Sequence, residues 1–104
     1  MQKRERNHEV RKMTDKQVMH DYLVDCLLKL ESKEECEALL SDLCTYAETD
    51  NMAQRMYSAK LILDGLTYNE VIEKTQISSA TLSRVSRCVK HGGGGYKRII
   101  DKTR

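Results

Sequence analysis

The sequence predicts an all-helical fold, and three observations support this class. The 104 residues include no Pro, and four of the five Gly stand next to one another, so few residues interrupt helices. Ser or Thr followed three residues later by Glu, the pattern of a helix N-terminus, occurs at Ser32–Glu35 and at Thr67–Glu70. Apolar residues recur at spacings of three and four along the chain. A chain of this length forms one small domain with a modest core.

Residues 67–90 predict a helix-turn-helix around which the rest of the chain is organised. Thr67 can cap a first short helix, and the chain breaks at residues 75–78. Ser78 or Ser79 can cap a second helix. The inward positions of the two helices are Val71, Ile72, Leu82, Val85 and Val89. In a helix-turn-helix the second helix lies in the DNA major groove.

The outward face of the second helix favours contact with nucleic acid. It carries hydroxyls and cations but no carboxylate, which suits phosphate: Ser79, Thr81, Ser83, Arg84, Arg87 and Lys90. The alternative is a pair of ordinary amphipathic helices. Gln76 stands in the turn, where many such motifs have Gly with a positive φ, so we expect modest strain there.

The distribution of charge also suits an oriented DNA-binding protein. The formal net charge is only +2, but residues 79–104 hold seven Lys/Arg against one Asp. Residues 13–78 hold six Lys/Arg against thirteen Asp/Glu. The basic charge therefore begins where the proposed second helix begins. Residues 1–12 hold five Lys/Arg against two Glu, and we interpret these as an ordinary solvated terminus.

The preceding part of the chain predicts helices that form a dimer. Residues 1–13 lack an apolar stripe and are expected to be a mobile arm. Thr14 can cap a helix to about Leu30 that is apolar on most sides and needs cover on most sides. In so short a chain, the expected cover is a second copy. Two further helices are expected over residues 32–48 and 52–64, the latter ended by Gly65.

Four glycines, Gly92–Gly95, end the helix-turn-helix, because they cannot continue a helix at reasonable cost. They are either a hinge for the second helix or, in the interpretation we prefer, a plain flexible turn. Residues 96–102 are expected to form one or two final helical turns, with Tyr96, Ile99 and Ile100 inward.

The sequence gives little support to a metal site, an enzyme or a membrane protein. The four cysteines have no Cys-x-x-Cys spacing and no His at ligand spacing. Cys26, Cys36 and Cys44 are expected to be small buried residues in a reducing cytosol. The three histidines suggest no catalytic pair. No signal peptide or membrane-length apolar run occurs, so we expect a cytoplasmic protein. No cofactor is expected.

The chain resembles the Trp repressor superfamily. The resemblance rests on Ile-Leu-Asp-Gly at 62–65, the capped short helix, and Ser-Ser-Ala-Thr-Leu-Ser-Arg at 78–84. Residues 55–65 and the glycine-rich tail are more similar to its YerC/YecD-like branch. The resemblance covers residues 14–104 and implies a six-helix fold and an intertwined homodimer, with dimerisation helices in 14–66. DNA contacts would fall on Asn69, Ser79, Ala80, Thr81, Ser83 and Arg84, with Lys90 near the backbone.

The resemblance also raises the question of tryptophan as an effector. Arg55 and Arg84 match the two arginines that hold tryptophan in the Trp repressor. The next residue is Gly in the repressor but Val85 here, and its branched side chain should fill much of the slot. The protein would then use another small effector or none. Alternatively, Arg55 forms a surface ion pair with Asp50 or another acidic residue.

Two function classes follow. The first is a dimeric DNA-binding transcription regulator, expected to be a repressor, that reads a near-palindromic operator. The second is a helical protein-interaction module that has kept the fold without specific DNA binding. Salt separates them, because DNA binding weakens steeply as salt rises and a mostly apolar interface does not.

We predict that tryptophan does not bind tightly, because the resemblance implies that the Val85 side chain should fill much of the space that the indole ring needs. Isothermal titration calorimetry should detect no binding at millimolar tryptophan. Micromolar binding would show that this interpretation of Val85 is wrong.

Overall fold

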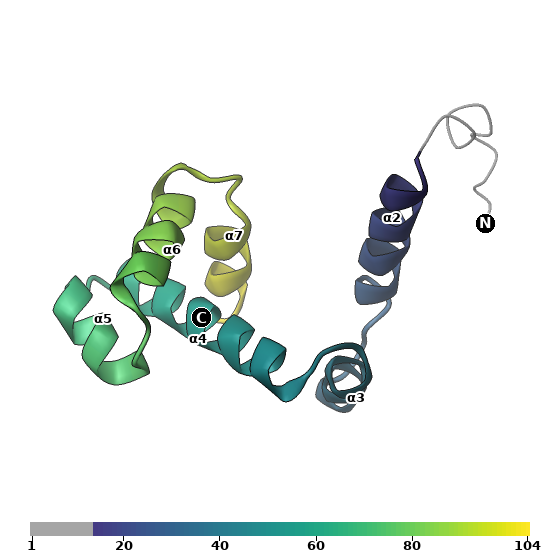
Figure 1. Cartoon of the computed structure of the whole chain (residues 1–104), viewed down its shortest axis with the longest axis horizontal. Helices are drawn as coiled ribbons and strands as arrows, with labels where there is room; N and C mark the ends of the chain where they lie inside the picture. Colours follow the sequence, from purple (N-terminus) through teal and green to yellow (C-terminus); the bar gives the residue numbers. More distant parts are fainter. Residues whose placement is uncertain (1–13) are drawn as a thin grey trace. The chain divides into compact units, whose positions relative to one another are not determined.

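The structure, a computed structural model, describes residues 14–104, and this part of the chain contains six α-helices and no strand (Figure 1). The expected all-helical class and the number of helices are confirmed. The expected mobile arm over residues 1–13 lies outside the described residues. The helices are α2 (Asp15–Leu27), α3 (Lys33–Leu43), α4 (Tyr46–Leu63), α5 (Tyr68–Thr75), α6 (Ser79–His91) and α7 (Gly95–Lys102).

Threonine caps fix the start of three of these helices. Thr14, Thr45 and Thr67 each stand before the first helical residue, accept a hydrogen bond from the backbone N–H three residues on, and complete a capping box. Thr14 and Thr67 were expected as caps. Each box satisfies backbone N–H groups that have no partner within the helix, which stabilises the helix start.

The cap at Thr45 shows that the expected boundary between the second and third helices is wrong. The Thr45 hydroxyl accepts from the Glu48 N–H at 3.1 Å, and the Glu48 carboxylate accepts from the Thr45 N–H at 2.8 Å. The chain therefore ends α3 at Leu43 and starts α4 at Tyr46, instead of continuing one helix to residue 48. The break expected at residues 49–51 lies inside α4.

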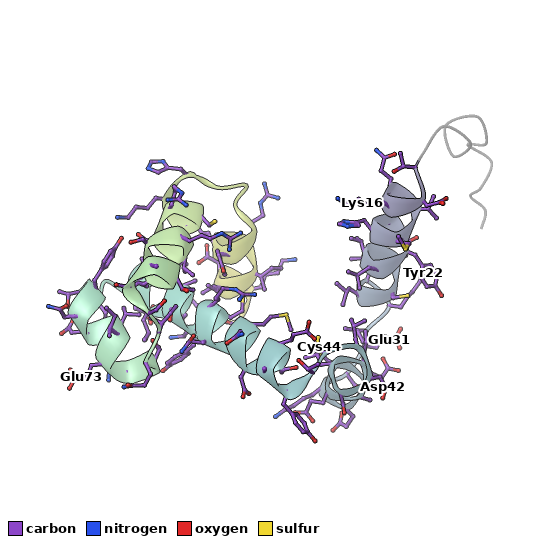
Figure 2. The ribbon with its side chains drawn as sticks, viewed as in Figure 1. Lys16, Tyr22, Glu31, Asp42, Cys44 and Glu73 are labelled. Carbon is purple, nitrogen blue, oxygen red and sulfur yellow. The ribbon has the colours of Figure 1, made fainter. Side chains whose placement is uncertain are left out.

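The described residues divide into two compact units, one ending at Leu40 and one covering Ser41–Arg104, with the boundary inside α3. In the first unit, α2 buries none of its residues. Met19 and Tyr22 are 65% and 70% exposed, and Figure 2 shows the Tyr22 side chain on the outside of the helix. The other large apolar side chains of this helix are also exposed: Val18, Leu23, Val24 and Leu27. The expected broad apolar surface is thus present and uncovered in the single chain.

The core lies in the second unit, where α6 packs against α4 with α5 and α7 on its two sides (Figure 1). Seven buried apolar side chains from α4 to α7 form it: Ala59, Leu61, Val71, Ile77, Leu82, Val85 and Ile100. The expected inward positions Val71, Leu82 and Val85 are confirmed. Ile99 is 52% exposed, so its expected inward position is wrong, because the adjacent Ile100 is the residue that α7 turns toward the core.

Gly65 turns the chain from α4 into α5, as expected. Its φ is +94°, and its N–H donates to the Ile62 carbonyl at 3.0 Å. The N–H of Leu66 donates to the Leu61 carbonyl at 3.1 Å. These two bonds form a Schellman motif, which favours glycine because its left-handed residue carries no side chain.

The glycine segment is a tight turn rather than a four-residue joint. Gly95 already belongs to α7, which leaves Gly92–Gly94 between the helices. A Cβ on Gly92 would stand 2.5 Å from the Cys88 carbonyl oxygen, and Gly94 has φ +90°. Glycine is therefore required at these two positions, whereas Gly93 and Gly95 have open space.

An ion-pair cluster holds the end of α7 against the end of α4. Asp64 accepts from Lys60 Nζ at 2.8 Å, and Arg104 Nη2 lies 2.8 Å from the other Asp64 oxygen. Hydrogen bonds from Lys60 and then Arg104 lower the pKa of the Asp64 carboxyl below its ordinary value. The resulting stabilisation is present above the ordinary pKa and is lost as the pH falls through the lowered one.

Candidate nucleic-acid interface

Helices α5 and α6 form the expected helix-turn-helix. Thr67 caps α5, and the Thr67 backbone N–H donates to Glu70 Oε1 at 2.8 Å. This bond, and then the Thr67 hydroxyl, lower the pKa of the Glu70 carboxyl. Ser78, one of the two expected candidates, caps α6 by accepting from the Thr81 N–H at 3.1 Å. Both helices therefore begin at residues fixed by local hydrogen bonds.

The turn contains the expected strain at Gln76. Its φ is +62°, the one positive φ at a non-glycine residue in the described chain. A left-handed conformation costs an L-residue roughly 1–2 kcal/mol. The Gln76 side chain offsets part of this cost, because its Nε2 donates to the Glu73 carbonyl at 2.9 Å.

Thr75 anchors the turn to α4. Its hydroxyl accepts from the buried Ser58 hydroxyl at 3.3 Å and donates to the Val71 carbonyl at 2.8 Å. Its carbonyl accepts from Gln54 Nε2 at 3.0 Å. The N–H of Ile77 also donates to the Thr75 hydroxyl, at 3.2 Å. These bonds fix where α6 begins relative to α4.

Helix α6 has one buried face and one polar face. Leu82, Val85 and Ser86 are buried. The opposite face is exposed and includes most of the residues expected to contact DNA: Ser79, Ala80, Ser83, Arg84, Arg87 and Lys90. Thr81 is half-buried, with its hydroxyl accepting from Ser78 at 2.9 Å, and Asn69 is exposed on the first turn of α5. The structure thus places all the expected DNA-contact positions on these two helices.

The cations of α6 are available for an external anion. Within residues 14–104, no carboxylate oxygen lies within 4.0 Å of the charged groups of Arg84, Arg87 or Lys90. Helix α6 contains no acidic residue in its first turn, and Lys90 and His91 stand in its last turn. Nothing on this helix neutralises the positive charge or repels phosphate.

Tyr68 belongs to this surface but was not expected there. Its hydroxyl donates to the buried Ser86 of α6, and Lys90 Nζ lies 6.0 Å from the centre of its ring. Eighteen residues separate Tyr68 from Ser86, and the spacing along the chain does not reveal the contact.

Of the two arginines considered for an effector, Arg55 lines a hollow in the described part of the chain. The hollow has a volume of about 300 Å³ and five other lining residues: Leu43, Cys44, Glu48, Asn51 and Met52. Arg84 does not line it. The alternative ion pair of Arg55 with Asp50 is absent, since no carboxylate of the described residues lies within 4.0 Å of Arg55. Val85 is only 1% exposed and packs in the core.

Other kinds of site find little support in the described part of the chain. No group of three or more His, Cys, Asp or Glu among residues 14–104 could hold a metal ion. The four cysteines are free thiols and half-buried, so Cys26, Cys36 and Cys44 are less buried in the single chain than expected. No described helix has the length and apolar character needed to cross a bilayer.

A capped short helix, a tight turn and a second helix with one buried and one basic face define a helix-turn-helix protein. The chain belongs to the Trp repressor protein family, whose model matches residues 19–104. It is 37% identical over 84 residues to the uncharacterized protein YerC of Bacillus subtilis (strain 168). The aligned residues cover 81% of each of the two chains. The expected superfamily and its YerC-like branch are confirmed.

Two crystal structures have the same fold. One is a candidate Trp repressor from Staphylococcus aureus, with a TM-score of 0.79 and 36% identity, covering 88% of this chain and 95% of that one. The other is a TrpR-like protein from Eubacterium eligens ATCC 27750, with a TM-score of 0.76 and 34% identity, covering 80% and 86%. The Trp-repressor-like fold is therefore shown, and the family is one of DNA-binding regulators.

We predict that Gln76→Gly stabilises the protein by about 0.5–1 kcal/mol, because glycine adopts a positive φ without a clash between Cβ and the backbone. The control is Lys74→Gly in the right-handed helix α5, which should destabilise it by about 1 kcal/mol. Urea unfolding of both variants measures the free energies. A loss of stability in Gln76→Gly would mean that the side-chain bond to Glu73 outweighs the strain.

Proposed function

We propose that this protein is a sequence-specific DNA-binding transcription regulator that acts as a homodimeric repressor in the cytoplasm and has no enzymatic activity. The observation that carries the proposal is the polar face of α6, which exposes Arg84, Arg87 and Lys90 without a carboxylate while its opposite face packs in the core. Membership of the Trp repressor family supports the same function.

In this proposal α6 enters the major groove and the start of α5 meets the backbone. Ser79, Ala80, Thr81 and Ser83 lie in the first half of α6 and present short groups to base edges, directly or through water. Arg84 has the reach for a bidentate contact with guanine. The longer cations toward the end of the helix, Arg87 and Lys90, contact phosphate together with Asn69.

The uncovered apolar surface of α2 supports the homodimer. Monomeric proteins rarely expose many large apolar side chains side by side, and α2 is a helix without one buried residue. A second copy supplies apolar cover of the same kind in a symmetric arrangement. Two helix-turn-helices related by a two-fold axis would read half-sites about one helical turn apart on a near-palindromic operator.

The proposed regulator is not controlled by tryptophan. The core position of Val85 supports the prediction that tryptophan is not the effector, because its side chain cannot move aside without opening the core. Arg55, and Arg84 in the assembled dimer, are the groups that would attract the anionic part of another small effector. A protein whose pocket is closed by its own side chains would need none.

Selection of random duplex DNA on the purified protein at physiological salt tests the function. We expect enrichment of a two-fold symmetric site without tryptophan, and a dimer in sedimentation. Enrichment that requires tryptophan would contradict the effector prediction. If no sequence is enriched and any association is insensitive to salt, the protein-interaction module is the better description.

We predict that Arg87→Ala weakens binding to all duplexes and lowers the slope of log K against log salt by about 1 for each subunit, because one phosphate contact is lost. The matched control is Arg98→Ala, which removes an exposed arginine from α7. Fluorescence anisotropy at several salt concentrations measures both. Unchanged binding in Arg87→Ala would place Arg87 outside the interface.

A further inference from the structure

Tyr68 joins the two ends of the helix-turn-helix that lie farthest apart in sequence. It is the first residue of α5, directly after the capping Thr67, and its hydroxyl donates to Ser86 in the second half of α6. Ser86 is only 3% exposed, so this bond satisfies a buried hydroxyl. Tyr68 is therefore held at two points: its backbone belongs to α5, and its hydroxyl is bonded to α6.

The fixed ring lies beside Lys90, one turn beyond Ser86 on α6. Lys90 Nζ is 6.0 Å from the ring centre, within the range of a cation–π interaction. No carboxylate in residues 14–104 competes for this ammonium within 4.0 Å. Among the described residues, this is the one cation held over an aromatic ring.

The position of the ring matters because Lys90, a cation of the proposed interface, lies beside it. A lysine loses rotamer freedom when phosphate holds it, and a side chain that is already restricted loses less. The ring can thus reduce the entropy cost of the Lys90 contact.

We propose that Tyr68 is a positioning residue for DNA binding: its ring holds Lys90, and its bond to Ser86 holds the ring, so that Lys90 is in place before DNA arrives. This inference rests on the proposed function. Tyr68 itself need not touch DNA. Its effect on affinity passes through Lys90.

Two variants and a control test the proposal in anisotropy titrations with the selected duplex. Tyr68→Leu, which lacks the ring, should bind about two- to fivefold more weakly for each bound subunit. Tyr68→Phe keeps the ring and should recover part of this loss. Tyr46→Leu is the matched control, because Tyr46 is also the first residue after a capping Thr, at 90% exposure, and should bind as the wild type does.

Measuring Tyr68→Leu in a Lys90→Gln variant shows whether Tyr68 affects DNA affinity through Lys90. In that background Tyr68→Leu should change the affinity by less than twofold, because the cation it positions is gone. An equal loss in both backgrounds, or binding by Tyr68→Leu as tight as the wild type, would overturn the proposal. Thermal unfolding and sedimentation confirm that each variant is folded and keeps the wild-type assembly state.

An NMR measurement on the DNA-free protein separates this proposal from the proposed function. The Tyr68 ring current should shift the Lys90 methylene protons upfield, and the shift should vanish in Tyr68→Leu and persist in Tyr68→Phe. Absence of the shift in the wild type overturns the positioning role whatever the DNA result. If the shift is present but the protein binds no duplex, the contact between Tyr68 and Lys90 exists and the proposed function is wrong. The positioning role in DNA binding is then wrong as well.

Discussion

The contact between the turn of the helix-turn-helix and α4 determines how the rest of the second unit is arranged. The Ser58 hydroxyl and the Gln54 amide of α4 both bond to Thr75, and Ala59 is fully buried beside them. Small residues on α4 let α5 and α6 approach closely, and the core side chains Val71, Leu82 and Val85 close over this surface. The direction of the polar face of α6 follows from that packing.

Local sequence predicted the helix ends of this unit well because the residues that specify them act on near neighbours in the chain. Thr67 and Ser78 are caps with their partners three residues away, and Gly65 is a left-handed terminus; all three depend on near neighbours in the chain. The strain at Gln76 was also predictable, because the turn requires a left-handed residue whatever its side chain.

The errors arose where two local signals competed or where distant residues meet. Thr45-Tyr-Ala-Glu48 is a capping box, but the apolar spacing of Leu43, Cys44 and Ala47 favoured one continuous helix there. Ile99 and Ile100 are adjacent apolar residues, and only the packing of α7 on α4 decides which is buried. The contacts of Tyr68 with Ser86 and Lys90 cross between helices, so no spacing rule reveals them.

Because the apolar surface of α2 is uncovered in the single chain, operator binding by the proposed regulator depends on its own concentration. A helix of 13 residues with no buried side chain is only marginally stable alone in water. In the proposed dimer, packing and folding of this helix occur together, so the population of complete dimers rises with the square of the free monomer concentration. A cell that doubles the amount of this protein would more than double the occupancy of a sparsely filled operator, without any signal molecule.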